Sequence, residues 1–362
     1  MILMNKQKLI SLLIIPLIFL GFVIKNTDNK KQELTRVLGD FPEPPELQID
    51  TLESVKLENG WRYKIEYLVE NEDTLFDIPK DIVRAYLFIP YHEKGEKLPG
   101  IIAIHQDGNP QNAHLGKLET AGIKGDTTLF YGLELFNRGY IVICPDRFTH
   151  GERLNNGKPV TKMEEYIFPV EKRIGELILE GRTGIGKRVY DLMRATDVLY
   201  SLKEIDKERI GAIAHSGGGN YLVYFMFIDQ RVKLGVSSCG FNDLIDTYNR
   251  NYPMNVISSM ALPGLAKVGR SADYLAYLAP RPFLMTRGFW EYGRENSQRE
   301  ELSRDHVERT KNIEKYAMKR YIELEAEESL VTVYFEENGG FHSFPDSVKQ
   351  FAYKWIDGYL KE

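Results

Sequence analysis

Short apolar runs alternate along most of this chain with longer segments whose apolar residues recur at helical spacing. Runs that are apolar throughout are typical of strands buried on both faces, as in parallel sheets. Their alternation with helices predicts an α/β fold with a mostly parallel central sheet and helices on both faces. The predicted strands are Gly100–His105, Tyr140–Pro145, Arg209–His215, Val232–Cys239, Pro282–Thr286 and Leu330–Phe335. The predicted helices lie near Leu129–Arg138, Lys187–Leu202, Asn220–Ile228, Ser303–Ala326 and Asp346–Leu360.

The region before these runs has a different pattern. Trp61–Glu70 and Ile82–Pro90 are rich in strand-forming residues and partly alternate between apolar and polar. They predict an antiparallel strand pair joined by the acidic loop at 71–80. With 362 residues, 43% of them hydrophobic, the chain can bury a large core. A single catalytic domain over residues 51–362 would account for it.

The N-terminus has the layout of an export signal. Lys6 and Lys8 precede an apolar run from Leu9 to Ile24, and a polar, lysine-containing tail follows. This run is short for a bilayer crossing, which takes about 20 residues. Residues 1–24 can therefore be a cleaved signal peptide or an uncleaved membrane anchor, and we expect the protein on the periplasmic or extracellular face. Residues 25–50 are polar, contain FPEPPE, and predict a linker.

A serine at the end of one apolar run is the first candidate for chemistry. Ser216 lies in RIGAIAHSGGGN, where a strand is expected to end and a helix to begin after Gly217. A nucleophile on such a turn needs small residues two positions before and after it, in the pattern G-x-S-x-G. Here they are Ala214, a mild departure, and Gly218. The alternative is a glycine-rich turn in which Ser216 only caps the helix.

A serine hydroxyl needs a general base, and that base needs an orienting carboxylate. In serine enzymes built on such a sheet, the acid and then the histidine follow the serine along the chain. His342, in ENGGFHSFP after the last predicted strand, lies where the base belongs. Glu291 follows the strand RPFLMT and is the candidate acid, although aspartate is commoner there. Asp243, in CGFNDL after the preceding strand, is the alternative acid.

Acyl transfer also needs amide donors for the developing oxyanion. The amide after the serine belongs to Gly217, and the loop in IIAIHQDGNP offers the amide of Asp107, with Gln106 next. His105 and Asp107 could instead ligate a metal, but no further cluster of ligand types supports this. We therefore expect no metal at these residues.

Segments spread over most of the chain share the motifs of one family. They read HQDGNPQNAHLGKLETAG, YIVICPDRFTHGER, EGRTGIGKRVYDLMRATDVLYSL, RIGAIAHSGGGN, VSSCGFNDL, APRPFLMTRG and FHSFP. Together, from about Pro44 to the C-terminus, they resemble the acetyl xylan esterase-like and dienelactone hydrolase-like branch of the α/β-hydrolase superfamily. The resemblance implies that fold and the hydrolysis of carboxylic esters by Ser216, His342 and Glu291 without a cofactor. Outside this triad, Asp146 and Arg153 are expected to form a structural ion pair rather than to hold loops around the site. Asp191 and Arg194 are expected to link a helix to a loop rather than to take part in catalysis.

The expected function is that of a short-chain, acetyl esterase that acts through an acyl-enzyme on an acylated carbohydrate. A serine peptidase of the prolyl-oligopeptidase type has the same turn, but such chains usually carry a large N-terminal propeller. A non-catalytic, membrane-tethered binding protein is the other alternative, because Ala214 and Glu291 depart from the family pattern. The insertion from Phe148 to Ile185 is expected to contribute to the walls of the pocket.

Charge and cysteine content exclude other classes. A net charge of −5 and an isoelectric point near 5.9 give no electrostatic case for nucleic acid as a partner. The two cysteines, Cys144 and Cys239, form no CxxC pair and are predicted to be buried thiols. The expected partner is a small-molecule or carbohydrate ester.

Overall fold

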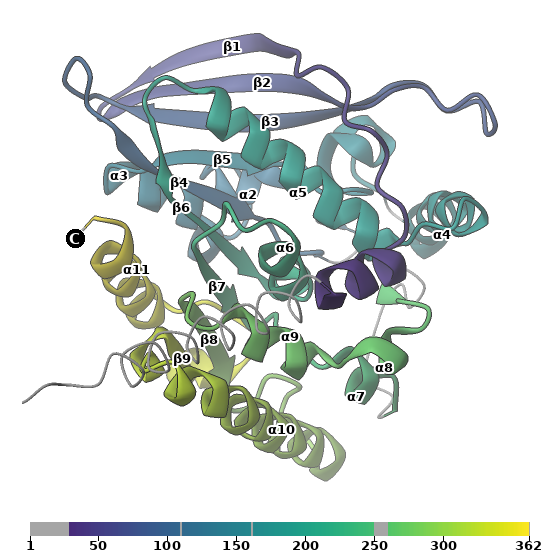
Figure 1. Cartoon of the computed structure of the whole chain (residues 1–362), viewed down its shortest axis with the longest axis vertical. Helices are drawn as coiled ribbons and strands as arrows, with labels where there is room; N and C mark the ends of the chain where they lie inside the picture. Colours follow the sequence, from purple (N-terminus) through teal and green to yellow (C-terminus); the bar gives the residue numbers. More distant parts are fainter. Residues whose placement is uncertain (1–28, 109–110, 161, 250–259, 362) are drawn as a thin grey trace, which may run out of the picture.

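A nine-stranded sheet forms the centre of the protein (Figure 1). The computed structural model describes residues 29–108, 111–160, 162–249 and 260–361. Across the sheet, the strands lie in the order β1-β2-β3-β5-β4-β6-β7-β8-β9. Their bounds are β1 Ile49–Leu57, β2 Gly60–Glu70, β3 Asp81–Pro90, β4 Leu98–Ile104, β5 Ile141–Pro145, β6 Ile205–His215, β7 Leu234–Ser238, β8 Phe283–Gly288 and β9 Leu330–Phe335.

Strand direction divides the sheet into two parts. β1, β2, β3 and β5 pair antiparallel in that order, and every pair from β5 to β9 is parallel. This arrangement confirms the predicted parallel sheet and antiparallel strand pair. The carboxyl ends of the parallel strands meet at one edge. The start of β3 lies at the same edge, because Ala85 pairs with Pro145 at the end of β5.

Helices cover both faces of the parallel part (Figure 1). α5, α6, α9 and α10 share a core with Ile102 and Ile104, whereas α3 and α11 share a second core with Ile101 and Ala103. Neighbouring strand residues are thus buried on opposite faces, which explains strands that are apolar throughout. The helices are α2 Lys117–Thr120, α3 Tyr131–Asn137, α4 Met163–Leu179, α5 Gly184–Ser201, α6 Leu222–Ile228, α7 Leu244–Asn249, α8 Leu265–Val268, α9 Ser271–Leu278, α10 Ser297–Glu323 and α11 Asp346–Leu360.

Part of the segment predicted as a linker is folded. Residues 29–38 are helical, and Leu34 and Leu38 are fully buried. The Thr183 hydroxyl donates a hydrogen bond of 2.6 Å to the Leu38 carbonyl. The structure corrects the linker prediction for these residues, because apolar side chains at 34, 37 and 38 recur at helical spacing within a polar segment.

The apolar run from Leu9 to Ile24 lies outside the described residues. Its role as a signal peptide or an anchor therefore stays a prediction. Within the part of the chain that the structure describes, no helix has the length and apolarity to cross a membrane.

Candidate active site

Ser216 lies in a sharp turn at the carboxyl end of β6. Its φ is +52°, a left-handed conformation that residues with a Cβ rarely adopt. The turn is closely packed: Ala214 is fully buried, and a Cβ on Gly218 would lie 2.6 Å from the carbonyl oxygen of His105. The strained turn and its small neighbours are therefore present where the sequence predicted them.

The helix after this serine begins later than predicted. A 3₁₀ turn over Ser216–Gly218 follows β6, and α6 begins only at Leu222. The helix predicted near Asn220–Ile228 is therefore confirmed with a start two residues later, and Gly217 lies in the 3₁₀ turn before it. Three consecutive glycines explain the delay, because glycine is unfavourable inside a helix.

Ser216, His342 and Glu291 form a continuous chain of hydrogen bonds. The distance between Ser216 Oγ and His342 Nε2 is 2.7 Å, and that between His342 Nδ1 and Glu291 Oε1 is 2.9 Å. If Nδ1–H donates to the carboxylate, Nε2 is left to accept from the serine hydroxyl. Loops after β6, β8 and β9 thus bring the serine, the histidine and the carboxylate together at the carboxyl edge of the sheet.

Asp243, the alternative acid, takes no part in this chain of hydrogen bonds. Its Oδ1 accepts from the amide of Ile245 at 3.0 Å and so caps α7, while its Oδ2 accepts from Arg270 Nε at 3.0 Å. The carboxylate is buried and already paired. The geometry favours Glu291.

The Glu291 carboxylate has two further partners, the Arg287 guanidinium and the His306 ring. Arg287 Nη1 lies 3.1 Å from each of its oxygens, and His306 Nε2 lies 3.5 Å from Oε2. Burial by itself would raise the pKa of Glu291, but the Arg287 guanidinium and the hydrogen bonds from both histidines hold that pKa well below its usual range. Glu291 is therefore ionised and fixed in place.

The loop after β4 borders the serine turn. A Cβ on Gly217 would lie 2.1 Å from the carboxyl carbon of Asp107, so only glycine fits there. Arg147 Nη2 holds the Asp107 carboxylate at 2.6 Å, and the Gln106 side chain donates to Glu119 at 3.0 Å. The three predicted oxyanion residues thus lie in the two segments that meet beside Ser216.

His105 is not available as a metal ligand. Its Nε2 accepts from the backbone amide of Arg147 at 3.1 Å, and its Nδ1 lies 2.6 Å from the carbonyl oxygen of Gln106. Nδ1 must be protonated to bond a carbonyl, so neither nitrogen has a free lone pair. Desolvation and the nearby Arg147 also keep the pKa of His105 well below its usual value, which leaves the ring neutral.

Comparisons with known proteins agree with this architecture. No protein-family model matches the chain. The "Putative hydrolase YtaP" of Bacillus subtilis (strain 168) is 28% identical over 266 residues, which cover 72% of this chain and 79% of that protein. A crystal structure of a "putative acetyl xylan esterase" from Bacteroides fragilis NCTC 9343 has a TM-score of 0.64 at 18% identity and covers 87% of this chain and 76% of its own.

The chain has the α/β-hydrolase fold. A glucuronoyl esterase from Solibacter usitatus also shares it, with a TM-score of 0.56 at 13% identity over 92% of this chain and 91% of that one. The predicted resemblance is confirmed at this level: acetyl xylan esterases are among the solved structures that the chain resembles.

Sequence reasoning missed several residues that hold the candidate site in place. Arg147 and Arg287 are buried and fix Asp107 and Glu291, respectively. His215 lies behind the base, with its ring centre 5.1 Å from that of His342. Burial and the neighbouring His342 lower the pKa of His215 to about 3, so it stays neutral. Arg287 directly follows one predicted strand and Arg147 lies two residues after another, and these positions could have marked them.

The residues predicted to be structural are buried and paired, although Asp146 and Arg153 are not ion-paired with each other. Asp146 forms a buried ion pair with Lys117 and accepts the amides of Lys117 and Glu152. Arg194 donates to Asp197 at 2.6 Å and to backbone carbonyls. These contacts agree with a structural role for both.

Three carboxylates, Glu70, Asp81 and Asp191, gather around one buried lysine. Lys187 Nζ lies 2.8, 2.6 and 2.5 Å from them. Arg153 adds contacts to Asp81 at 2.6 Å and to Asp191 at 2.5 Å. The lysine and the arginine neutralise the acidic set, so these carboxylates do not suit a metal ion.

Proposed function

We propose that this protein is a serine carboxylic-ester hydrolase that acts through an acyl-enzyme. The observation that carries the proposal is the chain of hydrogen bonds from Ser216 through His342 to Glu291. A serine hydroxyl that donates to a histidine can lose its proton to that ring as it attacks a carbonyl carbon. The carboxylate on the other ring nitrogen stabilises the imidazolium that results.

The reaction proceeds in two halves. Ser216 Oγ attacks the ester carbonyl while His342 Nε2 takes its proton, and the tetrahedral intermediate collapses as His342 protonates the departing alcohol. Water then enters, His342 takes one of its protons, and the hydroxide attacks the acyl group on Ser216. The second intermediate releases the acid, and Oγ recovers its proton from His342.

The developing oxyanion is assigned to backbone amides beside the serine. Gly217 supplies one donor, and the loop after β4 supplies the other, from Asp107 or Gln106. The ion pair between Arg147 and Asp107 supports this assignment, because it fixes the loop against Gly217. A fixed donor pair stabilises the charge without reorganising at the moment of reaction.

The proposed substrate is a short acyl ester, above all an acetyl ester, on a carbohydrate. Resemblance to structures named as acetyl xylan and glucuronoyl esterases supports a carbohydrate ester. The predicted export segment at residues 9–24 fits such a substrate, because plant polysaccharides lie outside the cytoplasm. Export itself stays part of the proposal.

Two alternatives have less support. A peptidase of the prolyl-oligopeptidase type would place a propeller ahead of the hydrolase domain. The described residues before β4 form one helix at 29–38 and the three strands β1 to β3. A non-catalytic binding protein would not need the strained serine and the three aligned side chains.

A fluorophosphonate probe tests whether the serine is reactive. We expect it to label the protein at Ser216 and to leave the Ser216→Ala variant unlabelled. Acetate release from acetylated xylan or mannan then tests the substrate class. Folded protein that resists the probe would contradict the esterase, and activity on aryl esters without activity on either glycan would contradict the carbohydrate substrate.

A further inference from the structure

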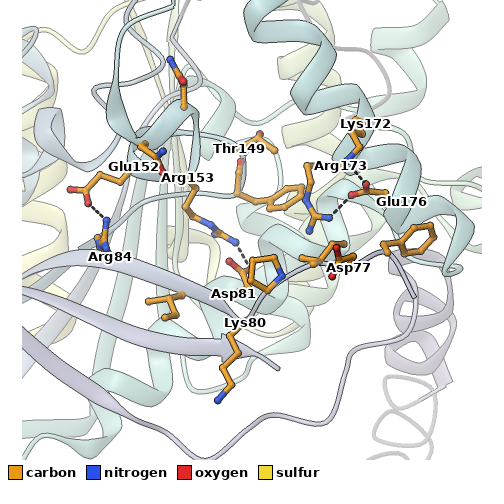
Figure 2. A pocket seen from close by; sticks show the side chains of 17 residues that line it. Asp77, Lys80, Asp81, Arg84, Thr149, Glu152, Arg153, Lys172, Arg173 and Glu176 are labelled. Atoms are coloured by element: carbon orange, nitrogen blue, oxygen red, sulfur yellow. Dashed lines mark hydrogen bonds and ion pairs between the residues drawn. The ribbon is translucent and has the colours of Figure 1, made fainter. Parts of the chain in front are cut away.

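A cavity opens at the same edge of the sheet as Ser216, beside β3 and β5 (Figure 2). Its volume is about 620 Å³, within the range of small-ligand sites. The walls come from the loop before β3, the loop after β5 and α4. In the strand order β3-β5-β4-β6, this cavity lies two to three strand spacings from the serine, about 10–15 Å.

Charged side chains of this cavity are largely paired with one another. Figure 2 shows Arg153 reaching Asp81, Arg84 reaching Glu152, and Lys172 and Arg173 converging on Glu176. Arg153 is buried against Asp191 as well. Asp77 and Lys80 also line the cavity, at exposed positions. The four carboxylates and five basic side chains of the lining therefore nearly balance, and the cavity lacks the excess of one charge that a phosphate or a metal ion would need.

The remaining lining groups are apolar surfaces interspersed with amides. Phe76, Ile82 and Phe148 supply apolar surface, and Asn155 and Asn156 supply side-chain amides. Among the described residues, no hydrogen bond engages either of these amides. These groups suit a sugar ring, because its C–H face can pack on the apolar side chains and its hydroxyl groups can form hydrogen bonds with the side-chain amides.

Backbone strain is concentrated around the same cavity. Asp77, Thr149, Asn155 and Asn156 all line it with φ values of +53°, +67°, +47° and +53°. Threonine at positive φ is a genuine outlier because its Cβ is branched. Strained conformations of this kind cluster at ligand sites, where the surrounding structure enforces them.

We propose that this cavity binds a neutral segment of oligosaccharide, as a subsite for the glycan that carries the ester. This proposal rests on the proposed function, since it places the sugar chain along the edge of the sheet between β6 and β3. The subsite would select polymeric over small substrates without touching the reacting atoms.

Calorimetric titration of xylohexaose and mannohexaose into the full-length Ser216→Ala protein tests the subsite. We expect one of them to bind, and Phe76→Ala and Asn156→Gly each to weaken binding about tenfold. Glycine at 156 removes the amide but keeps the positive φ. Phe351→Ala, an exposed phenylalanine on α11, is the matched control and should bind unchanged.

Kinetics separate this proposal from the proposed function. In the catalytically intact protein, Phe76→Ala and Asn156→Gly should lower kcat/KM on acetylated glycan about tenfold and leave kcat/KM on p-nitrophenyl acetate unchanged. Failure of both hexasaccharides to bind, or equal binding by the variants, overturns the subsite. Binding only of a uronate-bearing oligosaccharide would overturn the neutral ligand. If the wild-type protein shows no Ser216-dependent hydrolysis, the proposed esterase function is overturned. The titration would still show whether the cavity binds an oligosaccharide.

Discussion

At the scale of single residues, the carboxylate of Glu291 depends on Arg287. The guanidinium contacts both carboxylate oxygens at 3.1 Å inside the protein. Burial would otherwise favour the protonated acid, which carries no negative charge to stabilise a protonated His342 ring. Arg287 is thus a positioning residue that keeps Glu291 ionised.

Replacing Arg287 should change the pH dependence of the reaction. In Arg287→Met the pKa of Glu291 rises, so the carboxylate takes up a proton at higher pH as the solution is acidified. The acidic limb of the kcat/KM profile for p-nitrophenyl acetate should move to higher pH. Arg281→Met, which removes a donor to the Val232 carbonyl away from the site, should leave the limb in place. An unmoved limb in Arg287→Met would contradict this role.

A methyl group added at Gly217 would clash with the Asp107 side chain beside Ser216. Gly217→Ala would force a Cβ to within 2.1 Å of the Asp107 carboxyl carbon, so the Asp107 side chain must leave its place against Arg147 and disturb the loop that it fixes. We expect kcat/KM to fall about 100-fold, the effect of a displacement on the order of 1 Å. Gly175→Ala on α4, where a Cβ meets nothing within 4 Å, should leave activity unchanged and stabilise the fold by about 0.5–1 kcal/mol. Comparable activities of the two variants would count against the oxyanion assignment.

At the scale of elements, the helix at 29–38 is part of the folded body. Leu34 is fully buried within the core that covers one face of the sheet. Leu34→Ala should lower the free energy of unfolding by about 2–5 kcal/mol, measured by urea unfolding. Leu179→Ala, at a side chain that is 78% exposed, should change it by less than about 0.5 kcal/mol. Equal changes in the free energy of unfolding for the two variants would show that the helix at 29–38 does not pack against the core.

Which elements could be predicted depends on how their side chains are buried. β4 to β9 are largely apolar because most are covered on both faces, and their runs are visible in the sequence. β1 was missed because most of its side chains are exposed, so it has no apolar face to recognise. α10 begins at Ser297 rather than near Ser303, since Asn296 caps it in a stretch too polar to show helical periodicity.

Much of the candidate site could be predicted because loops after known strands must meet at one edge. Ser216, Glu291 and His342 each follow a predicted strand, and chain order assigned their roles. The choice between Glu291 and Asp243 could not be made from position alone, because both follow strands. The choice depended on which carboxylate already has other hydrogen-bond partners. The Asp243 carboxylate accepts hydrogen bonds from the first turn of α7 and from Arg270.

At the scale of the whole molecule, buried neutral histidines make the fold sensitive to acid. Burial and nearby cations lower the pKa of His150 to about 3, and burial with His342 does the same for His215. In the unfolded chain both rings take up protons below about pH 6.5. Their contribution to stability is therefore present above that pH and is lost as the pH falls toward 3.

Urea unfolding at a series of pH values measures this loss. Each histidine should lower the free energy of unfolding by about 1.4 kcal/mol per pH unit between pH 6 and 4. His150→Gln should remove about half of the slope that His150 and His215 together cause in the free energy of unfolding against pH. His92→Gln, at an exposed site, should leave that slope unchanged. A free energy of unfolding that is constant over this range would contradict the neutral state of the buried rings.

The proposed role of Ser216 as the nucleophile of an esterase can be tested by a single kinetic comparison. We would measure kcat/KM for p-nitrophenyl acetate with the wild-type protein and with Ser216→Ala, after confirming that both are folded. The account predicts serine-dependent hydrolysis that falls by about 10⁴-fold or more in the variant, as when triad residues are removed elsewhere. Near-wild-type hydrolysis by Ser216→Ala would contradict it.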